Sequence, residues 1–142
     1  MSKGNTFETD WLKLIFQKVA IAGLADVELS TQLDVLYIGL HTADPGEAGS
    51  QTTSECAYTG YARVAVIRDA TGWTVTNNSV SPVAEISFPA ATAGSETATH
   101  FSVGTDSSGA GKILYKGTVT PNIIISNGVQ PILTTASTIT ED

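Results

Sequence analysis

The sequence has few of the residues that build disulfide frameworks and catalytic centres. It contains one cysteine, Cys56, and two histidines among 142 residues. One thiol cannot form an internal disulfide, and Cys56 has no basic neighbour that would lower its pKa, so we expect an inert cysteine. A chain of this length buries enough surface to fold without cross-links. We therefore expect a single domain over residues 1–142, with an arm and helix over 1–24 and a β-domain over 33–142.

Long apolar runs are also missing. No stretch of about 18 apolar residues occurs, which excludes a membrane-spanning helix. The first residues are polar and charges follow from Glu8 onward, so the pattern of a signal peptide is absent. We expect a protein that is made in a cytoplasm, stays soluble and has no membrane partner.

Basic residues are scarce. The chain has 7 lysines and arginines against 14 acidic residues, which gives a net charge of −7. A negative net charge favours solubility and repels phosphate backbones. We therefore expect no direct binding to nucleic acid.

Catalytic motifs are not found either. The glycine-rich residues 104–112 fail the spacing of a phosphate-binding loop, because Asp106 stands where its first glycine belongs and Ile113 replaces its Ser or Thr. We expect a hairpin connection there instead. His41 and His100 fall in different predicted strands without a ligand at metal-binding spacing. The sequence thus predicts no enzyme, with no catalytic residue, no cofactor-binding residue and no metal ligand.

The remaining charged candidates have ordinary explanations. Asp44 and Glu47 flank a Pro-Gly turn but lack the alternating acidic spacing of a calcium loop, so we expect solvated loop charges. Arg63 and Arg68 are separated by an odd number of positions in one predicted strand. They should point to opposite faces, which argues against a shared anion site.

One helix is predicted, over residues 6–23. Asn5 is its expected N-cap and Gly23 its expected C-terminal cap. Apolar residues recur four apart at Phe7, Trp11, Ile15 and Val19. Three further residues widen this row into a broad arc: Leu12, Phe16 and Ala20. We expect this arc to pack on the chain's own sheet; the alternative is a helix that also touches a neighbouring subunit. The interface hypothesis names Phe7, Trp11, Ile15 and Phe16.

From residue 33 onward the apolar pattern has a period of two, and turn residues recur about every ten positions. The expected strands are 33–41, 60–69, 73–76, 80–88, 97–103, 112–119, 122–126, 129–133 and 137–140. The expected core is Leu36, Ile38, Leu40, Val64, Val66, Trp73, Phe88, Phe101 and Leu114. Short strands with turns between them predict a mainly β fold, an antiparallel β-sandwich or jelly roll with one N-terminal α-helix.

Several segments together resemble a known family. Residues 36–49 and 58–64, with 72–75, 99–104 and 114–115, are similar to small virion proteins of tailed bacteriophages that are often labelled tail fibre proteins. This resemblance implies a structural component of the virion without enzymatic activity. No functional residue transfers individually, because the family has no catalytic motif to match.

The resemblance leaves the place in the virion open. The chain has no fibrous shaft, coiled-coil heptads or collagen-like triplets, and it looks similar to capsid cement or decoration proteins. These are implied to bind the outside of the head as dimers or trimers and to bridge major capsid proteins, and this is our main expectation. The alternative contact of the helix is then with a neighbouring subunit or with the capsid surface. A tail fibre or tail-tip adaptor that binds other tail proteins is the alternative. A carbohydrate-binding module using Trp73, Tyr58 and Tyr61 is a third possibility.

Overall fold

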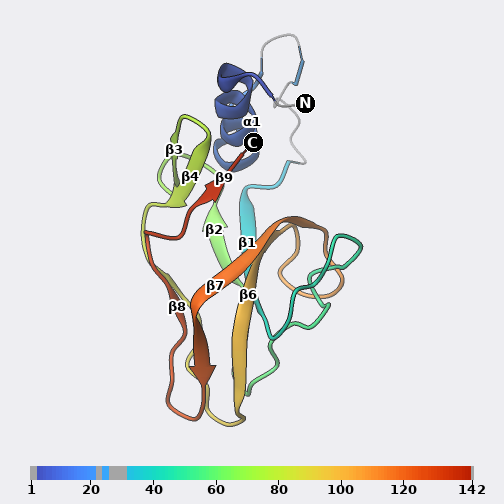
Figure 1. Ribbon diagram of the computed structural model, residues 1–142, viewed down its shortest axis with the longest axis vertical. Helices are drawn as coiled ribbons and strands as arrows, with labels where there is room; N and C mark the ends of the chain where they lie inside the picture. Colours follow the sequence, from blue (N-terminus) through green and yellow to red (C-terminus); the bar gives the residue numbers. More distant parts are fainter. Residues whose placement is uncertain (1–2, 22–23, 26–31, 142) are drawn as a thin grey trace. The chain divides into compact units, whose positions relative to one another are not determined.

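The computed structural model describes residues 3–21, 24–25 and 32–141 (Figure 1). Contacts between residues divide the chain into two compact units. Unit 1 comprises Met1–Val35, Ile67–Glu85 and Leu133–Asp142, and unit 2 comprises Leu36–Val66 and Ile86–Ile132. A single domain over residues 1–142 stays a prediction, and the two units are described separately here.

Unit 1 combines the helix with a small antiparallel sheet. Helix α1 (Asn5–Gln17) accompanies strands β3 (Trp73–Thr76), β4 (Ser79–Pro82) and β9 (Ile139–Thr140), which pair in the order β3-β4-β9. Leu12 and Phe16 are fully buried, and the Phe16 ring meets the Trp73 ring edge-on at 4.7 Å. Asn77 turns the β3–β4 hairpin with a φ of 53°, a left-handed angle that asparagine tolerates better than most residues.

The ends of α1 differ from the prediction. The helix stops at Gln17, where Lys18 takes the left-handed conformation and its backbone N–H bonds to the Lys13 carbonyl. Gly4 occupies the N-cap position in place of Asn5. The Arg68 guanidinium donates to the carbonyls of Leu14 and Ile15 and satisfies part of the last turn. The predicted cap Gly23 lies outside the described residues.

Most of the larger sheet lies in unit 2. Its order is β2-β1-β6-β7, formed by β2 (Val64–Ile67), β1 (Val35–His41), β6 (Glu96–Gly104) and β7 (Ile113–Ile125). Strands β1 and β6 are antiparallel, with Ile38 opposite Val103 and His41 opposite His100. The short strands β5 (Ile86–Ser87) and β8 (Ile132–Leu133) pair with each other.

The two faces of β1 differ in chemistry. One face carries three buried apolar residues, Leu36, Ile38 and Leu40. Because strand side chains alternate, Gly39 and His41 fall on the opposite face, where Gly39 stands across from Ser102 of β6. His41 and Ser102 are also fully buried. This sheet therefore has an apolar layer on one side and a buried polar layer on the other.

Several strand boundaries differ from the prediction, including 129–133 and 137–140, which are shortened to β8 and β9. The predicted strand 60–69 is shortened to β2, and the predicted strand 80–88 is divided into β4 and β5. The predicted strands 112–119 and 122–126 form one strand, β7, which continues through Pro121. A proline is tolerated there because β7 is an edge strand. The β6–β7 register shifts at this point, so residues 119–122 stand opposite Thr99 alone.

The predicted core is partly confirmed. Leu36, Ile38, Leu40, Trp73 and Phe88 are buried, whereas Val64, Val66, Phe101 and Leu114 are only half-buried. Leu12 and Phe16 are the buried row of α1, whereas Phe7 on the helix and Val19 beyond its end are exposed. The predicted principal row of apolar residues therefore lies beside the buried one. The neighbouring row is the buried one because the Phe16 ring packs against the Trp73 ring.

The predicted fold class is confirmed: the chain is mainly β, with antiparallel sheets and one N-terminal helix, consistent with a β-sandwich. Among the residues that the structure describes, no helix has the length and apolar character needed to cross a membrane.

Candidate functional site

Two loops lie together in unit 2 and form the candidate site. We call residues 42–54, which follow β1, the cover loop, and residues 105–112, between β6 and β7, the hairpin loop. The cover loop closes on itself because Thr42 N–H donates to the Ser54 carbonyl at 2.8 Å. It joins the hairpin loop where Gln51 N–H donates to the Gly111 carbonyl at 2.9 Å. The prediction of a hairpin connection at residues 104–112 is thus confirmed.

Arg63 joins Glu55, the residue that follows the cover loop, to the hairpin loop. Its Nε and Nη2 atoms bind the two Glu55 carboxylate oxygens at 2.7 and 2.8 Å. Its Nη1 and Nη2 atoms also donate to the carbonyls of Asp106 and Gly109 in the hairpin loop, both at 2.8 Å. The side chain is only 2% exposed. The bond to Glu55 raises the pKa of Arg63, so the guanidinium stays charged.

Tyr61 also binds the Glu55 carboxylate. Its hydroxyl donates to Glu55 Oε1 at 2.9 Å and accepts from Leu40 N–H at 3.0 Å. Burial raises the pKa of the Tyr61 hydroxyl far above its ordinary value. The hydroxyl therefore remains a donor at every physiological pH and connects the Arg63–Glu55 pair to strand β1.

Gln51 is the second link between the loops. It is fully buried, and its Oε1 accepts from Asp106 N–H at 2.9 Å. A Cβ placed on Gly104 or Gly111 would overlap the Gln51 side chain. These two glycines, which at first suggest a phosphate-binding loop, make room for a buried glutamine.

His41 lies in the polar layer under the cover loop. Its Nδ1 is 2.8 Å from the Thr53 carbonyl oxygen, and its Nε2 is 2.8 Å from Ser102 Oγ. Because a carbonyl only accepts, Nδ1 carries the proton and Ser102 donates to Nε2. A Cβ on Gly39 would come within 3.2 Å of Ser102 Oγ, so glycine leaves space for this pair. Burial lowers the pKa of His41 and keeps the ring neutral.

The hydrogen bonds of His41 and Ser102 resemble those of a hydrolase base and nucleophile, but both residues are fully buried. A substrate cannot reach them without removal of the cover loop. Burial also raises the pKa of Cys56 to about 12, which leaves little thiolate at neutral pH. In residues 3–21, 24–25 and 32–141, no group of three or more His, Cys, Asp or Glu side chains is arranged to hold a metal ion. This geometry supports a structural role for the polar layer.

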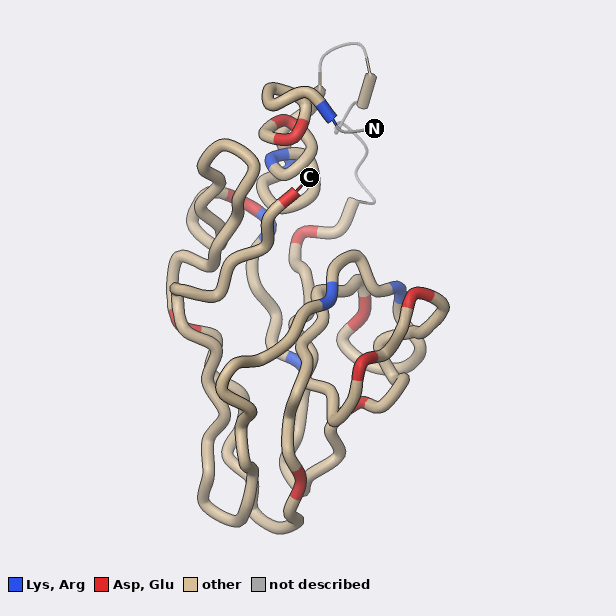
Figure 2. The backbone as a smooth tube through the Cα atoms, in the orientation of Figure 1, with Lys and Arg blue, Asp and Glu red and all other residues tan. Residues whose placement is uncertain are grey.

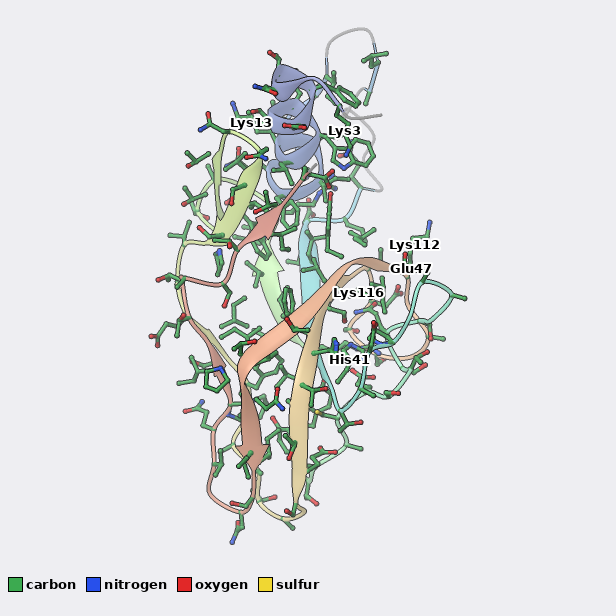
Figure 3. The ribbon with its side chains drawn as sticks, in the orientation of Figure 1. Lys3, Lys13, His41, Glu47, Lys112 and Lys116 are labelled. Carbon is green, nitrogen blue, oxygen red and sulfur yellow. The ribbon has the colours of Figure 1, made fainter. Side chains whose placement is uncertain are left out.

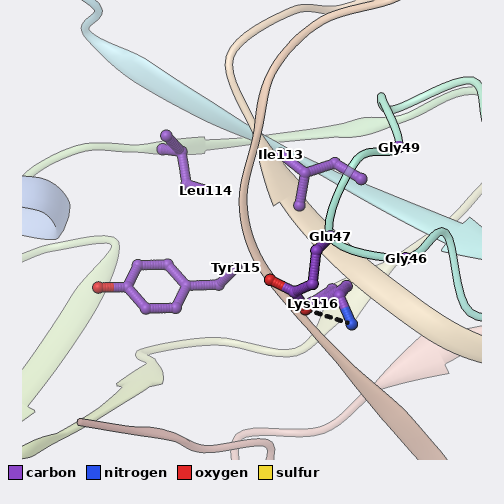
Figure 4. A pocket seen from close by; sticks show the side chains of 7 residues that line it. All are labelled: Gly46, Glu47, Gly49, Ile113, Leu114, Tyr115 and Lys116. Atoms are coloured by element: carbon purple, nitrogen blue, oxygen red, sulfur yellow. Dashed lines mark ion pairs between the residues drawn. The ribbon is translucent and has the colours of Figure 1, made fainter.

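Lys116 attaches the tip of the cover loop. Its Nζ pairs with Asp44 at 3.0 Å and with Glu47 at 3.1 Å. The hydrogen bond from the Gly46 N–H lowers the pKa of the Asp44 carboxyl, and the hydrogen bond from Lys116 lowers it further. Next to these residues is an open hollow of about 290 Å³, lined by Gly46, Glu47, Gly49 and residues 113–116 (Figure 4). Figure 3 labels Glu47, Lys116 and His41 around the cover loop. Asp44 and Glu47 are loop charges as predicted, although both are paired.

The residues predicted for an interface or for sugar binding differ in their exposure to solvent. Phe16 belongs to the core of unit 1 and is not available to a partner. Phe7 is 39% exposed, and its ring lies 6.4 Å from that of Trp11, while Trp11 and Ile15 are half-buried. Trp73 and Tyr58 are buried, and the half-buried Tyr61 ring stacks on Phe88, so these three rings form no exposed aromatic platform.

Sequence reasoning missed the residues that shape the site: Gln51, Glu55, Ser102 and the joint role of Tyr61 and Arg63. Arg63 and Glu55 are eight positions apart and belong to no local motif. The available signal was the pair of glycines at 104 and 111, which marks close packing against a partner whose identity the sequence does not reveal.

Replacement of Arg63 by Ala should destabilise the protein by about 3–5 kcal/mol, because it leaves the Glu55 carboxylate partly buried without its charge partner. Chemical denaturation measures this change. The matched control is Lys116→Ala, which removes a cation of strand β7 whose partners Asp44 and Glu47 are exposed, and it should have a far smaller effect. Equal losses in both variants would show that burial of the Arg63 pair does not matter.

Stability should fall as the pH is lowered below about 6.5, the ordinary pKa of histidine. The folded protein holds His41 neutral, so the unfolded chain binds more protons in this range, and acid favours unfolding until the folded-state pKa is passed. Denaturation curves between pH 7 and 5 test this. His41→Gln should flatten the slope, and an unchanged slope in this variant would contradict the assignment.

Comparison with known proteins gives one result at the level of the family. The family model described as Gp80, podophage GP4 fiber I protein gp80, matches residues 3–140. No curated protein matches the chain significantly. The matched range begins before helix α1 and extends into β9, so it includes residues of both units and the whole loop site. The chain therefore belongs to the family of the podophage GP4 fiber I protein gp80.

Proposed function

We propose that the chain is a non-enzymatic, fibre-type structural component of a phage tail. The observation that carries this proposal is the family match over residues 3–140, whose description is that of a fibre protein. This description supports the tail alternative better than the capsid cement role that the sequence led us to expect. The virion is then its place of action, and other tail proteins are its partners.

The loop site supports a binding role. Hydrogen bonds within unit 2 occupy the side chains of Arg63, Glu55 and Gln51. These bonds order the cover loop and the hairpin loop. A loop pair that is already ordered loses little conformational entropy when it meets a partner. We therefore assign the exposed surface of the cover and hairpin loops to recognition, with the buried groups as its support.

The outer side of α1 supplies a second contact surface in this proposal. Phe7, Trp11 and Ile15 remain at least partly accessible beside the buried row of Leu12 and Phe16. Aromatic side chains of this kind dominate protein interfaces because they bury a large area with few rotatable bonds. We assign this side of the helix to contact with a neighbouring tail protein.

The experiment that tests the proposal is localisation of tagged protein on purified virions by labelled antibody and negative stain. Label at the tail is expected, and label spread over the head shell would instead support the cement role. A Phe7→Ser variant should be incorporated less into virions, whereas Val83→Ser, at another exposed apolar residue of unit 1, should be incorporated normally. Equal incorporation of both variants would remove the helix from the interface.

A further inference from the structure

Charged residues in unit 2 are concentrated at the loop site. They are Asp44, Glu47, Glu55, Arg63, Asp106, Lys112 and Lys116, with Glu96 as the exception. Figure 2 shows the acidic and basic positions gathered around these loops, and a long tan stretch beyond them. The charge of this unit is therefore distributed very unevenly.

Two other segments of unit 2 have no charged residues. Residues 86–95 and 117–132 contain no Asp, Glu, Lys or Arg. Glu96 lies between these segments in β6, but its Oε1 accepts from the N–H groups of Ala57 and Tyr58 at 2.8 and 2.6 Å. We call the exposed residues of these two segments the uncharged surface.

Hydrogen bonds join the two segments into one surface. Ala91 N–H donates to the Val129 carbonyl at 2.9 Å, and Gly128 N–H donates to the Ala91 carbonyl at 2.7 Å. Two large apolar side chains are exposed there: Ile124 at 74% and Ile132 at 39%. The uncharged surface thus combines small polar residues with apolar anchors.

We propose that the uncharged surface is where two copies of this chain bind each other. Each copy carries a net charge of −7, so two copies repel unless they meet through surfaces without like charges. Interface centres are depleted of charged residues and enriched in apolar ones, which matches this surface. The proposal rests on the fibre-type structural role proposed above.

The binding mode is side-chain packing and not addition of strands. The free edge of β7 is poorly suited to extending a sheet, because its β6 register is broken at residues 119–122 and Pro121 has no N–H group. In the earlier part of β7, the charged Lys116 disfavours pairing with another strand. Ile124 then acts as an anchor that enters a contact with the second copy.

The test compares Ile124→Lys with Val83→Lys in the purified full chain. Val83 is an exposed apolar residue of unit 1 at 46%, so both variants add one positive charge at an exposed β-branched residue. Light scattering and sedimentation equilibrium give the molar mass as a function of concentration. Wild type and Val83→Lys should associate equally, and Ile124→Lys should associate about tenfold more weakly or worse, because a charge is left unpaired in the contact. Thermal unfolding verifies that each variant is folded.

Three results would overturn the proposal. They are a wild-type chain that stays monomeric at the highest concentration, an Ile124→Lys variant that associates like wild type, and equal weakening by Val83→Lys. If the isolated chain is monomeric and Ile124→Lys loses only its incorporation into virions, a different protein occupies this surface. Localisation on the tail is measured separately, so the proposed function and this contact fail independently.

Discussion

The bidentate ion pair between Arg63 and Glu55 is the interaction on which the arrangement of the loops depends. Buried charges are unfavourable unless they are paired and their remaining donors and acceptors are satisfied. Arg63 meets this condition by also binding the carbonyls of Asp106 and Gly109, while Tyr61 donates to Glu55. One side chain therefore fixes the return of the cover loop and the path of the hairpin loop.

Tyr61 connects this ion pair to strand β1, whose sheet buries a different chemistry on each face. On the apolar face Ile38 and its neighbours exclude water, and on the other face His41 and Ser102 bond to each other under the cover loop. Groups whose hydrogen bonds resemble those of an active site are thus buried, and His41 joins strand β1 to the cover loop. The charged residues gather at the loops and leave the uncharged surface of unit 2 suited to contact with like-charged copies.

Local signals predicted part of this structure. The β3–β4 hairpin followed from alternation and from Asn77, which sits at the turn. The end of α1 did not, because it is set by Lys18 in a conformation rare for lysine and by Arg68 far along the chain. The gap predicted between strands 112–119 and 122–126 is wrong, since only the sheet order shows that Pro121 lies in an edge strand. The site itself joins residues distant in sequence, which no motif records.

The central claim is that Arg63 makes the two loops one ordered surface, and amide hydrogen exchange tests it most directly. In Arg63→Ala, the amides of Thr42 and Gln51 in the cover loop and of Thr105 and Gly111 in the hairpin loop should lose protection together, while those of β1 keep theirs. Loss of protection in one loop alone, or in neither, would show that the loops are ordered independently and would contradict the account.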